Sequence, residues 1–179
     1  MRLARTIDLA SVAAADQPAL EFQISFSTEL GFDNVIVEAA PAGTQDWTTL
    51  PEAGGATSTT PPTQCEAGFL LEMHPFLTHY LTPGNPCGSS GSSGDWNALT
   101  GDSNGYQQVA YDLSTYAGGS VDVKISYVTD PASGGIGVFV DDTRVTTGGG
   151  TTVLDADGFE GATSLWTVEG APEGSPGNQ

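Results

Sequence analysis

Alternating apolar and polar positions are the clearest pattern in this chain, and they predict β-strands. Residues 19–27 (ALEFQISFS) alternate without a break, which gives one apolar and one polar face. Residues 120–129 (SVDVKISYVT) alternate in the same way. Such a pattern is typical of strands that bury one face and expose the other. The predicted inward positions are Leu20, Phe22, Ile24, Phe26, Val121, Val123, Ile125 and Tyr127.

Further strands are expected on both sides of these two. In the last of them Val138 and Val140 share one face and Phe139 lies on the other, which predicts a strand covered on both sides. The acidic pair Asp141–Asp142 is placed at the end of that strand. Glycine and proline clusters between the segments predict turns. The additional strand segments are residues 32–40, 46–51, 106–114 and 137–145.

Repeated short strands with antiparallel turns predict an all-β fold, namely an antiparallel β-sandwich of jelly-roll type with long loops. Residues 52–64 and 82–95 are small and polar, and we expect them to be loops. Residues 69–80 (FLLEMHPFLTHY) are apolar and ambiguous, although Pro75 argues against a continuous helix.

The length of 179 residues suits one ordinary domain. We expect residues 1–147 to form the sandwich, because the glycines at 148–150 predict a flexible joint. Residues 148–179 are then a joint and tail with one strand-like piece, LWTVEG. This tail either adds a strand to the sandwich or starts a unit that the chain does not contain.

The charge is strongly one-sided, since four lysines and arginines against 22 aspartates and glutamates give a net charge of −18. Nucleic-acid binding is disfavoured because phosphates repel such a polyanion, and anionic membrane surfaces are disfavoured for the same reason. No apolar run is long enough for insertion into a membrane. The composition predicts a soluble, acidic, secreted protein, with a protein adapted to high salt as the alternative.

The first residues, MRLARTIDLASVAAAD, superficially resemble a signal peptide. Asp8 interrupts the apolar stretch, and what remains is short. We therefore expect this segment to come from the interior of a longer exported protein.

Cys65 and Cys87 are the two cysteines, so a single intramolecular pairing exists. Export favours a disulfide between them, and two unrelated thiols are the alternative. Closing a loop of this size is worth about 3 kcal/mol. Neither cysteine lies in a CxxC pair, which argues against a metal site.

The sequence YDLSTYAGGSVDVKISYVTD, followed by GVFVDDTRV, resembles the MAM-like jelly-roll modules of secreted bacterial metallopeptidases of the immune inhibitor A type. The segments GFDNVIVEA, DWTTLPEAGGATS, CEAGFLLEMHPFLTHYLTPG and WNALTGDSNGYQQVAYDLS, with the tail GFEG…WTVEGAPEGSPGN, resemble the accessory region of secreted actinobacterial zinc carboxypeptidases. Together these segments cover nearly the whole chain.

The resemblance implies a sandwich attached to a zinc exopeptidase, with zinc only in the catalytic domain of the parent protein. The catalytic pattern of those enzymes is HxxE plus a distant histidine. His74 and His79 both lack a glutamate three residues on, so no catalytic residue can be carried over. The implied partners are the catalytic domain of the parent and its protein substrate. An accessory role is therefore the first functional hypothesis.

Two kinds of binding site remain open on residue type. Glu72, His74 and His79 are zinc-ligand types, but their spacing fits no zinc motif, and local hydrogen bonding is the alternative. Calcium prefers six to eight oxygen ligands, which the acidic turns offer, and solvated or turn-capping carboxylates are the alternative. The calcium candidates are Asp141, Asp142, Asp130, Asp33 and Glu29, of which Asp141 or Asp142 is the strongest.

Aromatic side chains suggest a second function, a calcium-dependent module that binds carbohydrate or a cell surface. Jelly-roll modules often stack sugars on exposed rings. The alternative is that Trp47 and Trp96 pack in the core or beneath loops. The candidate stacking residues are Trp47, Trp96 and Tyr106, with Tyr116 and Trp166 as further possibilities.

Overall fold

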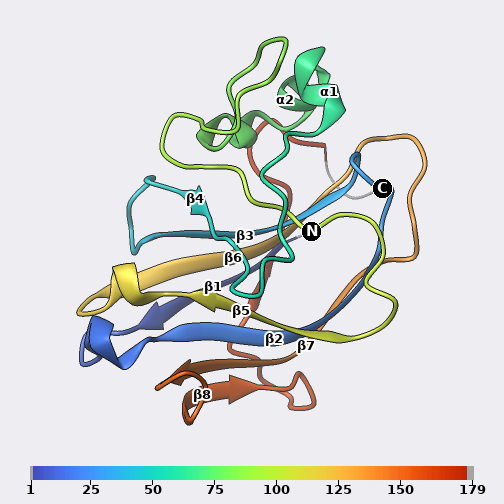
Figure 1. The fold of residues 1–179 in the computed structure, drawn as a ribbon. Coiled ribbons are helices and arrows are strands. Elements are labelled where there is room, and N and C mark those ends of the chain that lie inside the picture. The colour runs from blue at the N-terminus through green and yellow to red at the C-terminus, as the bar shows by residue number, and fades with distance from the viewer. Residues whose placement is uncertain (1, 177–179) are drawn as a thin grey trace.

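The strands form two antiparallel sheets packed face to face (Figure 1) in the structure, a computed structural model that describes residues 2–176. Sheet A contains, in order, β4 (Thr48–Thr49), β3 (Asn34–Pro41), β6 (Ser120–Val128), β1 (Arg2–Asp8) and β9 (Thr167–Glu169). Sheet B contains β5 (Gln107–Asp112), β2 (Ala19–Ser27), β7 (Gly137–Thr147) and β8 (Thr152–Asp157). The predicted all-β sandwich of jelly-roll type is confirmed.

The main core lies between the two sheets and follows from the alternation. Each inward residue predicted on β2 is buried, and the aromatic ring of Phe22 stacks on that of Tyr111 at 5.6 Å between centroids. On β6, Val121, Val123 and Ile125 are buried, and Tyr127 packs at the edge of the same cluster. Burying a side chain of this size stabilises a fold by about 1.5–3 kcal/mol. The two strands therefore account for much of the interior.

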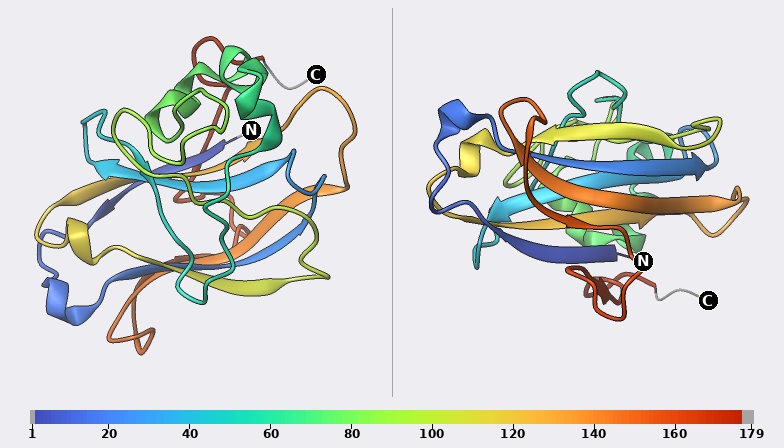
Figure 2. Two further views of the ribbon diagram at one scale, coloured as in Figure 1. Left: turned by 45° about the horizontal axis from the view of Figure 1, so that its top comes forward. Right: turned by 90° about the horizontal axis from the view of Figure 1, so that it is seen from below.

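A second core lies on the outer face of sheet A, because β3 is covered on both sides. Val35 and Val37 face the main core, whereas Ile36 packs into a separate cluster beneath residues 60–98. We call residues 60–98 the loop layer; it lies above sheet A in Figure 1 and in the left view of Figure 2. Its interior is filled by Leu70, Leu71, Leu77, Tyr80, Leu81, Trp96 and Ala98.

Short helices and a disulfide hold the loop layer together. It contains α1 (Thr63–Glu66), α2 (Phe69–Met73) and the 3₁₀ helix η2 (Pro75–His79). Pro75 begins η2 directly after α2 ends, as its lack of an N–H group predicts. Cys65 and Cys87 form a disulfide with their Cα atoms 5.8 Å apart, which confirms the predicted pairing.

Strand β1 is a feature that the sequence did not predict. Residues 2–8 pair with β6 on one side and β9 on the other, with Leu3 opposite both Ile125 and Val168. Residues 2–8 therefore form an inner strand of sheet A. Two 3₁₀ turns, η1 (Ala14–Asp16) and η3 (Ser114–Tyr116), close the same end of the sandwich.

Strand β7 differs from the prediction in two respects. Phe139 is 50 % exposed, so the strand is not covered on both sides at this point. The pair Asp141–Asp142 lies inside the strand rather than at its end, because pairing with β2 continues to residue 146. A shift in register at this pair and the positive φ of Asp142, 48°, mark a β-bulge.

The tail contributes one strand to each sheet. β8 pairs with β7, and β9 pairs with β1 through Leu3↔Val168. The placement of a domain boundary at residue 148 stays a prediction. Within residues 2–176, no helix has the length and apolar character needed to cross a membrane.

Candidate functional site

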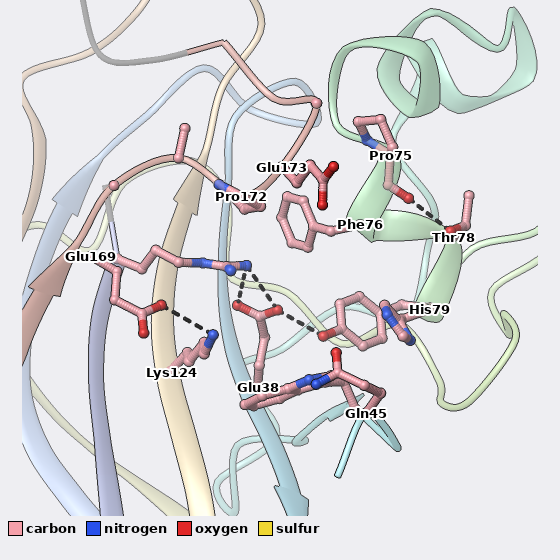
Figure 3. Close-up of a pocket in the computed structure, with 16 residues that line it drawn as sticks. Glu38, Gln45, Pro75, Phe76, Thr78, His79, Lys124, Glu169, Pro172 and Glu173 are labelled. Atoms are coloured by element: carbon pink, nitrogen blue, oxygen red, sulfur yellow. Dashed lines mark hydrogen bonds and ion pairs between the residues drawn. The ribbon is translucent and has the colours of Figure 1, made fainter. Parts of the chain in front are cut away.

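A groove of about 810 Å³ lies on the outer face of sheet A (Figure 3). Strands β3 and β6 form its floor, η2 of the loop layer forms one wall, and residues 169–174 form the other. We call it the outer groove. Its lining residues are Arg2, Glu38, Gln45, Trp47, Pro75, Phe76, Thr78, His79, Tyr80, Lys124 and Glu169–Gly174.

The period of the strands places polar side chains in this floor. Residues at even positions of β6 point away from the main core, as the alternation predicts. The register sets Lys124 beside Glu38 of β3 and Ser126 beside Arg2 of β1. Charged groups from three strands therefore gather on a face that the loop layer partly covers.

Glu38 is the centre of a buried hydrogen-bond network in the floor. Its two carboxylate oxygens each accept a hydrogen bond from Nη2 of Arg2 at 3.1 Å. The hydroxyl of Tyr80 donates to the same carboxylate at 2.7 Å, and that of Ser126 donates as well. Glu38 is only 2 % exposed, so these donors replace its water shell. Burial, reinforced by Glu38, raises the pKa of Tyr80, which keeps the phenol protonated as a donor.

Two cation–π contacts fix the walls of the outer groove. The guanidinium carbon of Arg2 lies 4.5 Å from the centroid of the Phe76 ring. Nζ of Lys124 lies 4.7 Å from the centroid of the Trp47 ring and 3.0 Å from a carboxylate oxygen of Glu169. Each contact is worth about 0.5–2 kcal/mol. Lys124 of the floor thus contacts both Trp47 and Glu169, which line the groove on different sides of it.

His79 presents a hydrogen-bond acceptor at the rim. Its Nδ1 lies 2.7 Å from Oγ of Ser93, and that hydroxyl donates to the carbonyl of Trp47 at 2.7 Å. Because a serine hydroxyl carries one proton, Nδ1 of His79 is the donor in this chain of bonds. Nε2 of the neutral ring then remains as an acceptor toward a ligand.

The two histidines take separate partners. Nε2 of His74 donates to the carbonyl of Thr129 at 2.9 Å, and burial lowers the pKa of this histidine. Within residues 2–176, no group of three or more His, Cys, Asp or Glu side chains is arranged to hold a metal ion. Glu72, His74 and His79 therefore do not assemble into a zinc site.

The calcium candidates lie in three different places. Asp141 accepts a hydrogen bond from the backbone N–H of Asp142 in the bulge of β7. Asp130 caps its own turn and accepts from the side chain of Gln64 at 3.1 Å. Glu29 and Asp33 share the turn between β2 and β3, where Asp33 Oδ2 lies 3.3 Å from the N–H of Glu29. Of the five candidates, the structure brings these last two together in one turn.

The aromatic candidates also differ in their surroundings. Trp96 is 1 % exposed, and its indole N–H donates to the carbonyl of Thr60. Trp47 is 9 % exposed and lines the outer groove beneath Lys124, whereas Tyr106 is 57 % exposed beside β5. The ring of Trp96 is therefore not accessible to a ligand. It packs in the second core, which agrees with the alternative that Trp96 is a core residue.

The comparison with known families identifies the domain. The family model described as "Immune inhibitor A-like, MAM domain" matches residues 79–174, more than half of the chain. The chain belongs to this family. As a MAM domain it is an accessory, non-catalytic domain of immune inhibitor A-type metallopeptidases. No curated protein matches the chain at a significant level.

The matched part of the MAM domain includes one wall and half the floor of the outer groove. Its residues include His79, Lys124 and Glu169. Sequence reasoning missed Arg2, Glu38 and Gln45 as site residues, because they come from separate segments with no shared spacing. The only local hint of this site was the row of polar residues at alternate positions of β6. Such a row marks a strand face that does not pack into the main core.

Proposed function

We propose that this MAM domain is the accessory domain of a secreted zinc carboxypeptidase-like metallopeptidase, and that it presents protein substrate to the catalytic domain through the outer groove. The observation that carries the proposal is the combination, in one groove, of a floor whose charged groups are paired and a rim of polar side chains. When the charged and hydrogen-bonding groups of a binding surface are already paired, their side chains need not rearrange on binding, and this lowers the cost of binding.

The rim suits an extended polypeptide. Gln45 offers an amide, His79 offers an acceptor nitrogen, and the backbone of residues 170–174 offers peptide groups along one wall. The half-buried ring of Phe76 and the largely buried ring of Trp47 line the same groove. Grooves with a few polar groups above apolar surface are typical of binding sites for flexible chains.

The charge of the domain indicates which segments it favours. All four lysines and arginines pair with carboxylates, and the net charge of the chain is −18. Cationic polypeptide segments are therefore attracted and anionic ones repelled, an effect that weakens as salt is added.

Kinetics of the parent peptidase with and without this domain test the proposal. We expect kcat/KM for a basic protein substrate to fall by about tenfold without the domain, equivalent to about 1.4 kcal/mol. Hydrolysis of a blocked dipeptide should not change, because it is too short to reach the groove. The double variant Gln45→Ala, His79→Ala should reproduce the loss, whereas Tyr106→Ala, outside the groove, should not.

Two results would contradict this function. Equal kcat/KM values for the protein substrate with and without the domain would remove the substrate-presenting role. Peptide hydrolysis by the isolated domain with added zinc would remove its assignment as a non-catalytic module.

A second candidate is carbohydrate binding in the same groove. It is favoured by the half-buried aromatic ring of Phe76, which lines the groove together with the planar polar side chains of Gln45 and His79. Sugars are commonly held by such combinations of ring faces and hydrogen-bonding groups. A glycan array with and without EDTA tests both this function and its dependence on calcium, and flat binding under both conditions would reject it.

A further inference from the structure

The turn between β2 and β3 contains two acidic side chains with unusual surroundings. Asp33 is 1 % exposed and its Oδ1 atom, shielded from solvent, has no hydrogen-bond partner among the described residues. Its other oxygen accepts from the Tyr127 hydroxyl at 3.0 Å and from the Glu29 N–H at 3.3 Å. A buried carboxylate with one bare oxygen is costly unless something else neutralises it.

Glu29 repeats the same pattern four residues earlier. Its Oε2 atom is also shielded and unpartnered within residues 2–176. The backbone of the turn is tight, because the carbonyl of Glu29 accepts from the N–H groups of Phe32 and Asp33. Thr100 fixes the turn from the neighbouring segment by accepting from the N–H of Gly31 at 2.8 Å. The two carboxylates are thus held in one well-ordered turn.

The basic side chains of the protein are all committed elsewhere. Arg2 pairs with Glu38, Arg5 with Asp155, Lys124 with Glu169 and Arg144 with Glu21. These are the four lysines and arginines that the sequence contains. Neutralisation of the turn by a side-chain cation is therefore not available, and two anions close together repel each other.

We infer that Glu29 and Asp33 bind a calcium ion in the β2–β3 turn. Both side chains supply oxygen, which is the ligand type that hard divalent cations take. Calcium fits better than magnesium because it tolerates irregular geometry and completes its shell with carbonyl oxygens and water. Zinc is disfavoured because neither histidine lies in this turn, and both are hydrogen-bonded elsewhere.

The ion also has a structural consequence. Asp33 joins the turn to β6 through Tyr127, and Leu99 joins β3 to the segment after the loop layer through paired backbone bonds with Val35. A calcium ion on Asp33 would neutralise the charge at the point where these three segments meet. Calcium binding should therefore stabilise the whole sandwich, since the turn is part of its core framework.

Thermal unfolding in calcium chloride and in EDTA tests the inference. We expect the Tm of the wild-type chain to rise by about 5 °C or more at calcium concentrations far above Kd. Asp33→Asn and Glu29→Gln should abolish most of the rise. Asp142→Asn, which neutralises an exposed acid in the bulge of β7, is the matched control and should keep it.

The order of stabilities separates a metal site from a purely structural role. In EDTA, Glu29→Gln should be at least as stable as wild type because it relieves charge repulsion, and in calcium the order should reverse. Glu29 is partly exposed, so this variant remains informative even if Asp33→Asn does not fold. Terbium luminescence excited through tyrosine should appear with wild type. It should fall at least fivefold in Tyr127→Phe, which replaces the tyrosine chromophore and removes the hydroxyl that donates to Asp33.

Two outcomes would overturn the inference. One is a wild-type Tm that calcium does not raise. The other is a rise that Asp142→Asn removes and Glu29→Gln keeps, which would place the ion at the β7 bulge instead.

Discussion

Arg2 and Glu38 form a buried ion pair on the outer face of sheet A, with one guanidinium nitrogen donating to both carboxylate oxygens. Their strands are not neighbours, because β6 runs between them and contributes the hydroxyl of Ser126 to the same carboxylate. The pair therefore ties three strands together and fixes the floor of the outer groove.

Glu38→Ala should be one of the most destabilising substitutions in this protein. It leaves the Arg2 charge buried without a partner and deprives Tyr80 of its acceptor, so we expect a loss of about 3–5 kcal/mol. Urea unfolding monitored by tryptophan fluorescence measures it. Glu169→Ala breaks a more exposed pair with Lys124 and should cost at most about 1 kcal/mol. If the two variants lose similar free energies of unfolding, burial of the Arg2–Glu38 pair does not increase its contribution to stability.

The Cys65–Cys87 disulfide should stabilise the loop layer through the unfolded state. Its sequence separation of 22 residues corresponds to about 3 kcal/mol of lost loop entropy in the denatured chain. The double variant Cys65→Ala, Cys87→Ala should lose about this amount in urea unfolding. Reductant should lower the stability of wild type by a similar amount and leave the variant unchanged. A reductant effect on the variant would point to another cause.

His74 should make stability depend on pH below neutrality. Burial outweighs its hydrogen bond to Thr129 and lowers its pKa in the folded state, so the unfolded chain takes up the proton first. The free energy of unfolding should be highest above the unfolded pKa of about 6.5 and fall as the pH drops below it. In His74→Gln, urea unfolding should show a flatter profile between about pH 7 and 5. An unchanged slope would mean that other groups cause it.

Gly135→Ala should weaken the contact between the 129–136 loop and β2. A Cβ atom at this position would overlap the carbonyl of Ser27, which the backbone can relieve only by moving. We expect a loss of about 1–3 kcal/mol, the usual cost of overpacking. Gly134→Ala is a matched control, because its Cβ would meet no heavy atom within 4 Å. Thermal unfolding of the two variants should separate them, and equal Tm values would contradict the packing argument.

Strands with a strict period of two were visible in the sequence, because burial of one face requires that period. The segment 19–27 coincides with β2, and the predicted segment 120–129 ends one residue beyond β6. The sequence did not predict β1, because Arg2 and Arg5 are typical of a solvent-exposed segment or of a targeting peptide. The structure buries both arginines against Glu38 and Asp155, which is long-range information that no local pattern contains.

The outer groove was beyond sequence reasoning for a related reason. Its residues come from strands, the loop layer and the tail, and pairing of β3 with β6 is what brings Glu38 beside Lys124. Acidic turns were recognisable as possible cation ligands by composition. Choosing among them required knowing which carboxylate oxygens are shielded and unpartnered, and in this protein those include oxygens of Glu29 and Asp33.

The pairing of β1 with β6 has a consequence for how this protein comes to be folded. Arg2 and Ser126 are 124 positions apart, yet they are neighbours in the register of sheet A. A growing chain on the ribosome therefore carries β1 with both edges open until β6 has emerged. Strand pairing over such separations is slow to form, and open edges invite association with other chains. We therefore expect aggregation through the unpaired β1 segment during synthesis to limit the yield of this domain. Chaperones that bind extended apolar segments should raise the yield of soluble protein.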